Sequence, residues 1–260
     1  MGNELAVKNG VGMSAYRKWD AVSASALKIF IRKSPYHYCE YLAGRLVQDS
    51  SAMQFGSAFH CYMEGPDVFR NSYAIAPEFD RRTKDGKDRY AVFCLEHAGK
   101  TVLSRSDYER IVAMGESILR VTTIRERVES FLAERESSWS WTDSESSLPC
   151  KARTDLYLPG EILDYKTTQD ASPDSFAYSV QKFLYHLSAH HYLTGIGADR
   201  FGWIAVESQY PYSAALYWLK PDKRYREIVD VYRRSMERLA ECVESNHWPF
   251  VESGEMDLVI

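Results

Sequence analysis

The spacing of hydrophobic positions changes along the chain. In the first half, apolar residues recur every three to four positions, which is the period of an amphipathic helix. This spacing predicts helices over residues 23–42, 51–64 and 107–121. Ser34-Pro35 is expected to interrupt the first helix, because a proline disfavours helical backbone at the residue before it. Gly65-Pro66 should end the second helix.

From residue 137 onward, apolar and polar positions mostly alternate, as they do in strands with one buried face. The predicted strands cover residues 137–142, 150–158, 161–167, 201–207 and 214–219. Long helices are predicted beside them over residues 172–195 and 222–243. Strands in the middle of the chain with helices on either side indicate an α/β fold built on a central sheet.

The remaining segments complete the expected organisation. Residues 1–20 are expected to form a loose lead-in, followed by a single domain over residues 21–260. Residues 77–90 are polar and contain a glycine, so a loop is predicted there. No internal repeat and no low-complexity linker divides the chain.

Composition narrows the class of protein. The chain has 260 residues, 45% of them apolar, which is enough for one sizeable core. Its apolar runs are far shorter than the ~20 residues of a membrane helix, and its start lacks an apolar secretory segment. The five cysteines stand singly, which disfavours a disulfide framework and favours a reducing cytoplasm. With a net charge of −4, any surface that binds a polyanion must be local.

The candidate chemistry lies on the two strands that flank Pro159-Gly160. A two-residue turn there places Asp155 opposite Asp164, with Lys166 on the same face. Carboxylates this close repel each other and need nearby positive charge, which Lys166 and a divalent cation such as Mg²⁺ would supply. The set predicts a phosphodiester-cleaving centre, in which the lysine positions or deprotonates the attacking water or stabilises the phosphorane. The alternative is a solvated surface hairpin, since a one-residue slip of register would separate the acids.

Three further candidates have weaker signals. The ring of His60 should overlie the turn containing Gly56, which leaves room for a ligand, a metal or a neighbouring strand. The alternative is a boundary histidine bonded to a backbone carbonyl. Glu136, at the head of its strand, lies near the expected cleft or is an ordinary exposed acid. Arg153 should share the active face near Lys166 and suits a phosphate oxygen.

The order of these motifs along the chain is distinctive. They read Gly56-xxx-His60, Glu136, Cys150-Lys-Ala-Arg-xx-Asp155 and Asp164-Tyr-Lys-Thr-Thr168. Together they resemble the PD-(D/E)xK nucleases, and among these the RecE-type phage and prophage exonucleases (exodeoxyribonuclease VIII), over about residues 20–250. Further matches are Ser23-Ala-Ser-Ala-Leu27, Ser34-Pro-Tyr-His-Tyr38, Asp80-Arg-Arg-Thr-Lys-Asp-Gly-Lys87 and Tyr185-His-Leu-xxxx-Tyr192.

The resemblance implies a restriction-endonuclease-like core, with a central mixed sheet flanked by helices. It implies Mg²⁺-dependent degradation of duplex DNA from its ends, 5′ to 3′, with Mn²⁺ as an alternative ion. The 3′ single strand left behind would pass to a single-strand annealing protein during phage-type recombination. The enzyme would work as a ring-shaped homo-oligomer, a trimer or tetramer, in the bacterial host cytoplasm and without a membrane. Carried over by position, the metal ligands would be His60, Asp155, Asp164 and the Tyr165 carbonyl, with Lys166 the catalytic lysine and Glu136 an accessory acid.

The chain departs from the family pattern at two positions. Thr154 replaces the proline before the first aspartate, and Ser188 stands where the family usually has glutamine. Gln181, on the same predicted helix face as Tyr185 and Tyr192, is the candidate to take over substrate positioning. These helix residues, with Ser188, are therefore predicted DNA contacts.

Residues 81–89 carry a local positive charge on an acidic protein. Arg81, Arg82, Lys84 and Lys87 could follow DNA phosphates. A solvated polar loop is an equally good interpretation of the same composition.

Other cofactors are not expected. Gly99-Lys100-Thr101 imitates the end of a P-loop, but Cys94 stands where its first glycine should be, which argues against nucleotide binding. Cys242 is the only cysteine after residue 150, which argues against an iron–sulfur cluster. Two alternatives to an exonuclease stay open: a structure-specific endonuclease with the same core, and a non-catalytic module that binds DNA ends.

Overall fold

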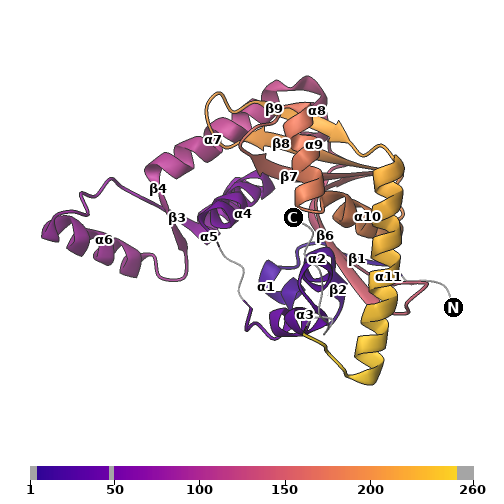
Figure 1. Ribbon diagram of the computed structural model, residues 1–260. Coiled ribbons are helices and arrows are strands. Elements are labelled where there is room, and N and C mark those ends of the chain that lie inside the picture. The colour runs from indigo at the N-terminus through magenta and orange to yellow at the C-terminus, as the bar shows by residue number, and fades with distance from the viewer. Residues whose placement is uncertain (1–4, 47–49, 251–260) are drawn as a thin grey trace, which may run out of the picture.

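A mixed sheet forms the centre of the structure, a computed structural model that describes residues 5–46 and 50–250 (Figure 1). Within these residues its strand order is β1-β5-β6-β7-β8-β9, and β2 pairs with β6. The strands are β1 (Ala6–Lys8), β2 (Val22–Ser23), β5 (Glu134–Thr142), β6 (Pro149–Leu158), β7 (Glu161–Thr168), β8 (Arg200–Glu207) and β9 (Ala214–Trp218). β5, β6 and β7 are antiparallel neighbours, whereas β7 and β8 are parallel. The predicted α/β fold with a central mixed sheet is confirmed.

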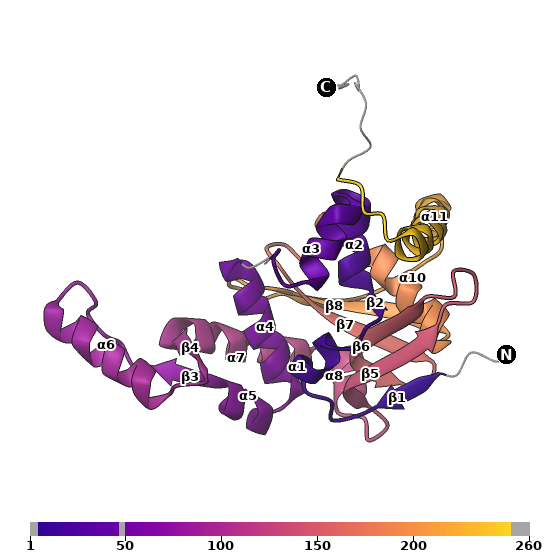
Figure 2. The same ribbon diagram turned by 90° about the horizontal axis from the view of Figure 1, so that it is seen from below.

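Helices cover both faces of this sheet, and each face has its own hydrophobic core (Figure 2). One face packs against α2 (Ala24–Arg32), α3 (Pro35–Leu42), α9 (Pro173–Lys182), α10 (Tyr185–Ile196) and α11 (Lys223–Ser245). The other packs against α4 (Ser51–Glu64), α5 (Pro66–Ser72), α7 (Arg105–Arg120) and α8 (Thr122–Val128). In the described part of the chain, no helix has the length and apolar character needed to cross a bilayer.

Helix boundaries follow the local sequence signals where such signals exist. Ser34 accepts a hydrogen bond from the His37 backbone N–H and Pro35 occupies the first turn of α3, so the predicted break between α2 and α3 is confirmed. The continuous helix predicted over residues 172–195 is wrong, because Leu184 adopts a left-handed conformation (φ 50°) that separates α9 from α10. No glycine or proline marks this break in the sequence. Partial burial of Leu184 against the core accompanies it.

The lead-in expected to be loose is tied to the body over its described residues. β1 pairs with β5, and α1 (Met13–Arg17) follows it. The buried Lys151 ammonium donates hydrogen bonds to the carbonyls of Tyr16, Arg17 and Trp19 at 3.2, 3.2 and 2.7 Å. A lysine in this position stabilises the carboxyl end of α1, whose carbonyls lack helical partners.

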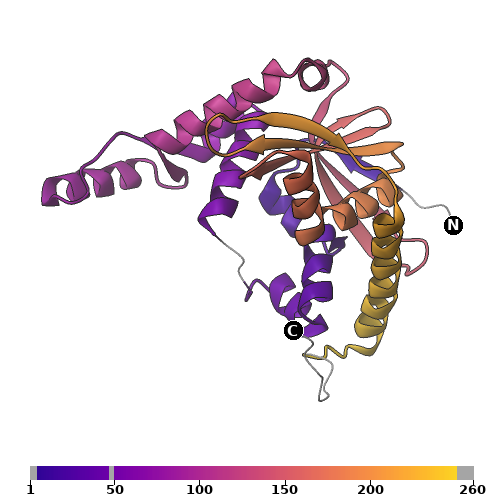
Figure 3. The same cartoon turned by 45° about the horizontal axis from the view of Figure 1, so that its top comes forward.

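Residues 73–104 form an arm that projects from the body (Figure 3). Its parallel strands β3 (Tyr73–Ala76) and β4 (Thr101–Ser104) are joined by α6 (Lys84–Glu96). The loop predicted over residues 77–90 therefore ends earlier, because Thr83 caps α6 by accepting a hydrogen bond from the Gly86 backbone N–H. The first half of α6 is polar, so its sequence shows no apolar helical period from which a helix could be predicted.

Candidate active site

The predicted hairpin turn joins β6 and β7. It pairs Leu158 with Glu161, as the two-residue turn requires. The paired stretch ends at Leu156, and beyond it the Asp155 carboxylate accepts a hydrogen bond from the Tyr165 backbone N–H at 2.7 Å. This bond fixes Asp155 against the neighbouring strand, at the point where the candidate side chains gather.

Asp164 and Lys166 form an ion pair on the same hairpin. Lys166 Nζ also donates to the Tyr165 carbonyl oxygen at 3.1 Å. Burial raises the pKa of Asp164 and the nearby Asp155 charge adds to this, while Lys166 opposes it. For Lys166, burial acts to lower the pKa, but the Asp164 and Asp155 carboxylates outweigh it and raise the pKa. The lysine is therefore held as a cation beside the two acids.

His60 reaches this hairpin from α4. Its Nδ1 lies 3.2 Å from Asp155 Oδ1. The preceding Phe59 is fully buried and meets Tyr165 edge-on at 6.1 Å between ring centroids, which sets the position of α4 on the sheet. Burial acts to lower the pKa of His60, but the Asp155 carboxylate outweighs it and raises the pKa.

Gly56 lies one turn before His60 and faces β7. A Cβ built at this glycine would lie 3.6 Å from Thr167 Oγ1, an ordinary contact distance. The sequence left room beside Gly56 for a ligand, a metal or a neighbouring strand, and in the structure the neighbouring strand β7 lies there.

Glu136 lies opposite Asp155 on β5. The flanking pairs are Arg135 with Leu156 and Ser137 with Thr154, so Glu136 and Asp155 face each other between them. Its φ of 53° is in the left-handed region, which is strained for a residue with a side chain and is often found at functional sites.

Arg153 forms an ion pair with Glu136 at 2.5 Å. The same guanidinium donates to the Val11 carbonyl oxygen and to Ser138 Oγ. Burial, with the neighbouring Asp155 charge, raises the pKa of Glu136 to about 7, although Arg153 opposes the shift. Arg153 is therefore engaged inside the site, and its side chain is only 9% exposed.

A divalent cation fits the donor set. His60, Glu136 and Asp155 each offer a ligand atom within 4.8 Å of the others. The predicted ligand Asp164 is not in this group, and its carboxylate pairs with Lys166, which also donates to the Tyr165 carbonyl oxygen. One imidazole among carboxylate and carbonyl oxygens suits a hard cation such as Mg²⁺ or Mn²⁺, and a cation would relieve the repulsion among the acids.

The predicted DNA contacts on α9 and α10 differ in how they relate to this centre. Tyr185 is adjacent, with its ring 5.1 Å from Lys166 Nζ. The Tyr192 hydroxyl donates to the Arg153 carbonyl oxygen at 3.2 Å, so it supports β6 from the face of the sheet that α10 covers. Ser188 lies on α10, whereas Gln181 lies on α9, so the helix face that Gln181 was expected to share is interrupted at Leu184.

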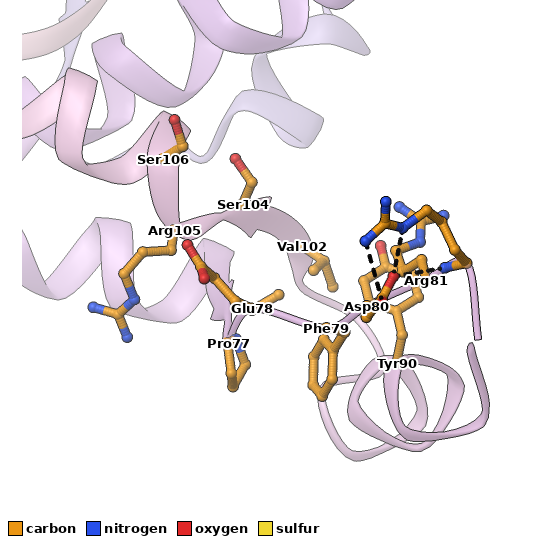
Figure 4. A pocket seen from close by; sticks show the side chains of 12 residues that line it. Pro77, Glu78, Phe79, Asp80, Arg81, Tyr90, Val102, Ser104, Arg105 and Ser106 are labelled. Atoms are coloured by element: carbon orange, nitrogen blue, oxygen red, sulfur yellow. Dashed lines mark hydrogen bonds and ion pairs between the residues drawn. The ribbon is translucent and has the colours of Figure 1, made fainter. Parts of the chain in front are cut away.

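Four of the predicted basic residues, Arg81, Arg82, Lys84 and Lys87, are on the outer part of the arm, around α6. Arg82 pairs with Asp80, and the Arg81 guanidinium lies 4.3 Å above the Tyr90 ring, beside a cavity of about 750 Å³ (Figure 4). Lys84 and Lys87 are exposed on α6. These four basic residues thus form a group apart from the candidate side chains at the hairpin.

Lys28 is a residue near the site that the sequence reasoning missed. Its Nζ lies 5.3 Å from the Tyr185 ring, to which Lys166 also points. Burial, followed by the Lys166 charge, lowers the pKa of Lys28 to about 7. A lysine between the buried Leu27 and Ile29 of an amphipathic helix is the signal that could have indicated it.

Known proteins share features with this chain. A family model described as "PDDEXK-like domain of unknown function (DUF3799)" matches residues 23–260. A candidate exonuclease from Eubacterium rectale has a similar structure, with 14% identity, a TM-score of 0.59 and 97% coverage of both chains. A phage-related exonuclease from Haemophilus somnus 129PT matches more weakly, with 13% identity, a TM-score of 0.38, and 90% of this chain and 99% of that chain covered. No curated protein matches the sequence.

Proposed function

Because the chain belongs to the PDDEXK-like DUF3799 family, we propose that it is a metal-dependent exodeoxyribonuclease acting on the ends of linear double-stranded DNA. The observation that carries the proposal is the hairpin on which Asp155, Asp164 and Lys166 converge, with His60 against Asp155. Two acids and a lysine on neighbouring strands, with an imidazole from α4 against them, are groups that suit metal-assisted phosphodiester hydrolysis.

The metal would be held by His60, Asp155, Asp164 and the Tyr165 carbonyl, with Glu136 as an accessory acid. A bound divalent cation lowers the pKa of water and neutralises the charge that develops on the phosphoryl group. The cationic Lys166 orients the attacking water and stabilises the phosphorane, since its ion pair with Asp164 favours its charged form. Arg153 holds Glu136 in place through their ion pair.

The remaining features of the proposal follow the family resemblance. Cleavage proceeds 5′ to 3′ and leaves 3′ single strands for an annealing protein in phage-type recombination. The chain works as a ring-shaped trimer or tetramer in the bacterial host cytoplasm. Basic residues of the arm contact the duplex backbone, as their exposure on an acidic protein permits.

An assay on end-labelled DNA tests the proposal. We expect linear duplex to be shortened in Mg²⁺, with release of the 5′ label first, and left intact in EDTA. Covalently closed circular DNA should stay intact, and the Asp164→Ala variant is the inactive control. Cleavage of the circle would favour an endonuclease with the same core. Binding of DNA ends without turnover at any Mg²⁺ or Mn²⁺ concentration would favour a non-catalytic module.

A further inference from the structure

A cleft of about 740 Å³ opens beside the candidate active site. It lies between the first turns of α4, strand β4 and helix α9, and Thr167 and Thr168 at the carboxyl end of β7 line it. Hydroxyl and amide side chains make up much of the wall, and Tyr185 stands at the end nearest Lys166. The cleft therefore leads from the surface to the catalytic hairpin.

Three aromatic rings and two ammonium groups follow one another beside this cleft. The Tyr185 ring lies 5.1 Å from Lys166 Nζ, and Phe183 stacks on Tyr185 with ring centroids 5.6 Å apart and planes at 29°. Beyond them, Lys182 Nζ lies 5.5 Å from the Phe183 ring and 5.7 Å from the Tyr178 ring. Aromatic faces beside a cation are the groups that bind a base and its phosphate together.

The outer two rings are exposed, although a tyrosine or phenylalanine stabilises a fold best when buried. Tyr178 is 64% exposed and Phe183 is 42% exposed. The other exposed aromatic residues of the described chain, Phe131, Tyr210 and Phe250, do not line this cleft. Two exposed rings on either side of one lysine, in a wall of mostly hydroxyl and amide groups with two carboxylates and a guanidinium, indicate a surface that a ligand with flat faces covers.

We propose that this cleft binds a single-stranded segment of nucleic acid, with bases stacked on Phe183 and Tyr178 and a phosphate at Lys182. A duplex pairs its bases inside and offers few base faces, so the ring path favours an unpaired strand. The proposal rests on the proposed nuclease function and deepens it, because the path ends at Lys166. Phe183 and Tyr178 are then positioning residues that hold a strand relative to the catalytic hairpin.

Binding in EDTA separates this proposal from catalysis. The probes are a fluorescein-labelled oligothymidylate and an abasic oligonucleotide of the same length, which has the phosphates without the bases. The double variant Tyr178→Ala/Phe183→Ala should bind oligothymidylate about 5- to 100-fold more weakly per lost stacking ring and bind the abasic strand unchanged. The single variant Phe183→Trp, which keeps an aromatic ring at this position, should bind oligothymidylate at least as tightly as wild type. Phe131→Ala, which removes a ring that is 94% exposed outside the cleft, is the matched control.

Three outcomes would overturn the proposal that this cleft binds a single strand. The double variant could bind oligothymidylate as wild type does, lose affinity equally for the abasic strand, or lose affinity equally for a blunt duplex of the same length. Thermal unfolding of each variant confirms that the fold is retained. Cleavage by the wild type in Mg²⁺ is measured separately. Base-dependent binding without cleavage would refute the proposed nuclease function and support the proposed strand-binding cleft. Cleavage without base-dependent binding would support the nuclease function and refute the cleft.

Discussion

The hairpin of β6 and β7 and the arm over residues 73–104 both carry predicted functional residues, but they hold them in different ways. On the hairpin, every candidate side chain contacts another candidate, and all of them are largely buried. On the arm, Arg81 lies over Tyr90 and Arg82 pairs with Asp80, whereas Lys84 and Lys87 face solvent. Buried interlocking charges suit chemistry at one point, whereas exposed charges suit adjustable contact with a long polyanion.

This difference predicts which measurement each region controls. Changes on the hairpin should alter the rate of cleavage with little effect on the salt dependence of DNA binding. Changes on the arm should do the opposite.

Removal of the Lys166 ammonium should have the largest effect on cleavage. We expect Lys166→Ala and Asp164→Ala to lower the single-turnover cleavage rate by at least about 10²- to 10³-fold, as for loss of a preorganised charge at the reacting phosphate. Circular dichroism and thermal unfolding should show an intact fold. If Lys166→Ala cleaves within tenfold of wild type, Lys166 is not the catalytic lysine.

His191, buried in the core under the sheet, should make the stability of the protein depend on pH. This buried side chain lies between the Lys151 carbonyl and the Tyr232 hydroxyl, at 3.1 and 3.0 Å. Burial lowers the pKa of His191 to about 4. The unfolded chain therefore binds a proton that the folded chain does not between pH 6.5 and about 4, and stability falls as pH falls through that window. The expected loss is about 3 kcal/mol.

A variant separates the effect of His191 on stability from that of groups whose titration changes stability in the opposite direction. Glu136, with its pKa raised to about 7, makes stability fall as pH rises over part of the same range. The difference in unfolding free energy between wild type and His191→Asn, measured by urea titration at pH 7 and pH 4.5, isolates the histidine. We expect His191→Asn to lose less stability than wild type over this interval. An identical pH dependence in the two proteins would refute the assignment.

The sequence predicted the hairpin better than the arm for a physical reason. Residues 150–166 carry a turn signal and an alternating pattern, so the register of the hairpin from Leu156 to Leu163 follows from local rules. The arm has no such pattern, because the apolar residues of α6 pack against a few arm residues rather than a broad core. The break at Leu184 and the approach of Lys28 depend on packing between distant segments, which periodicity does not encode.

The arm charges should control how salt weakens DNA binding. We expect the triple variant Arg81→Ala/Arg82→Ala/Lys84→Ala to bind duplex more weakly and to reduce the slope of log K against log salt by about 0.9 for each lost phosphate contact. The rate of cleavage at saturating DNA should change little. Lys223→Ala/Arg224→Ala/Arg226→Ala, which removes the same charge from the exposed start of α11, is the control. Equal salt slopes for wild type and the arm variant would make residues 81–84 an ordinary solvated surface.

The smallest effect is expected from Gly86, which sets the start of α6. A Cβ at this buried glycine would lie 2.1 Å from the Asp80 carbonyl oxygen, so Gly86→Ala must displace the backbone that carries Arg81 and Arg82. We expect faster amide hydrogen exchange over residues 80–90 and a modest decrease in the salt slope. The melting temperature of the body and the cleavage rate at saturating DNA should not change, because α6 lies at the outer end of the arm, away from the hairpin (Figure 3). Gly12→Ala, at a glycine with open space around it, should alter none of these quantities. A cleavage defect in Gly86→Ala as large as that of Lys166→Ala would show that arm and hairpin act as one unit.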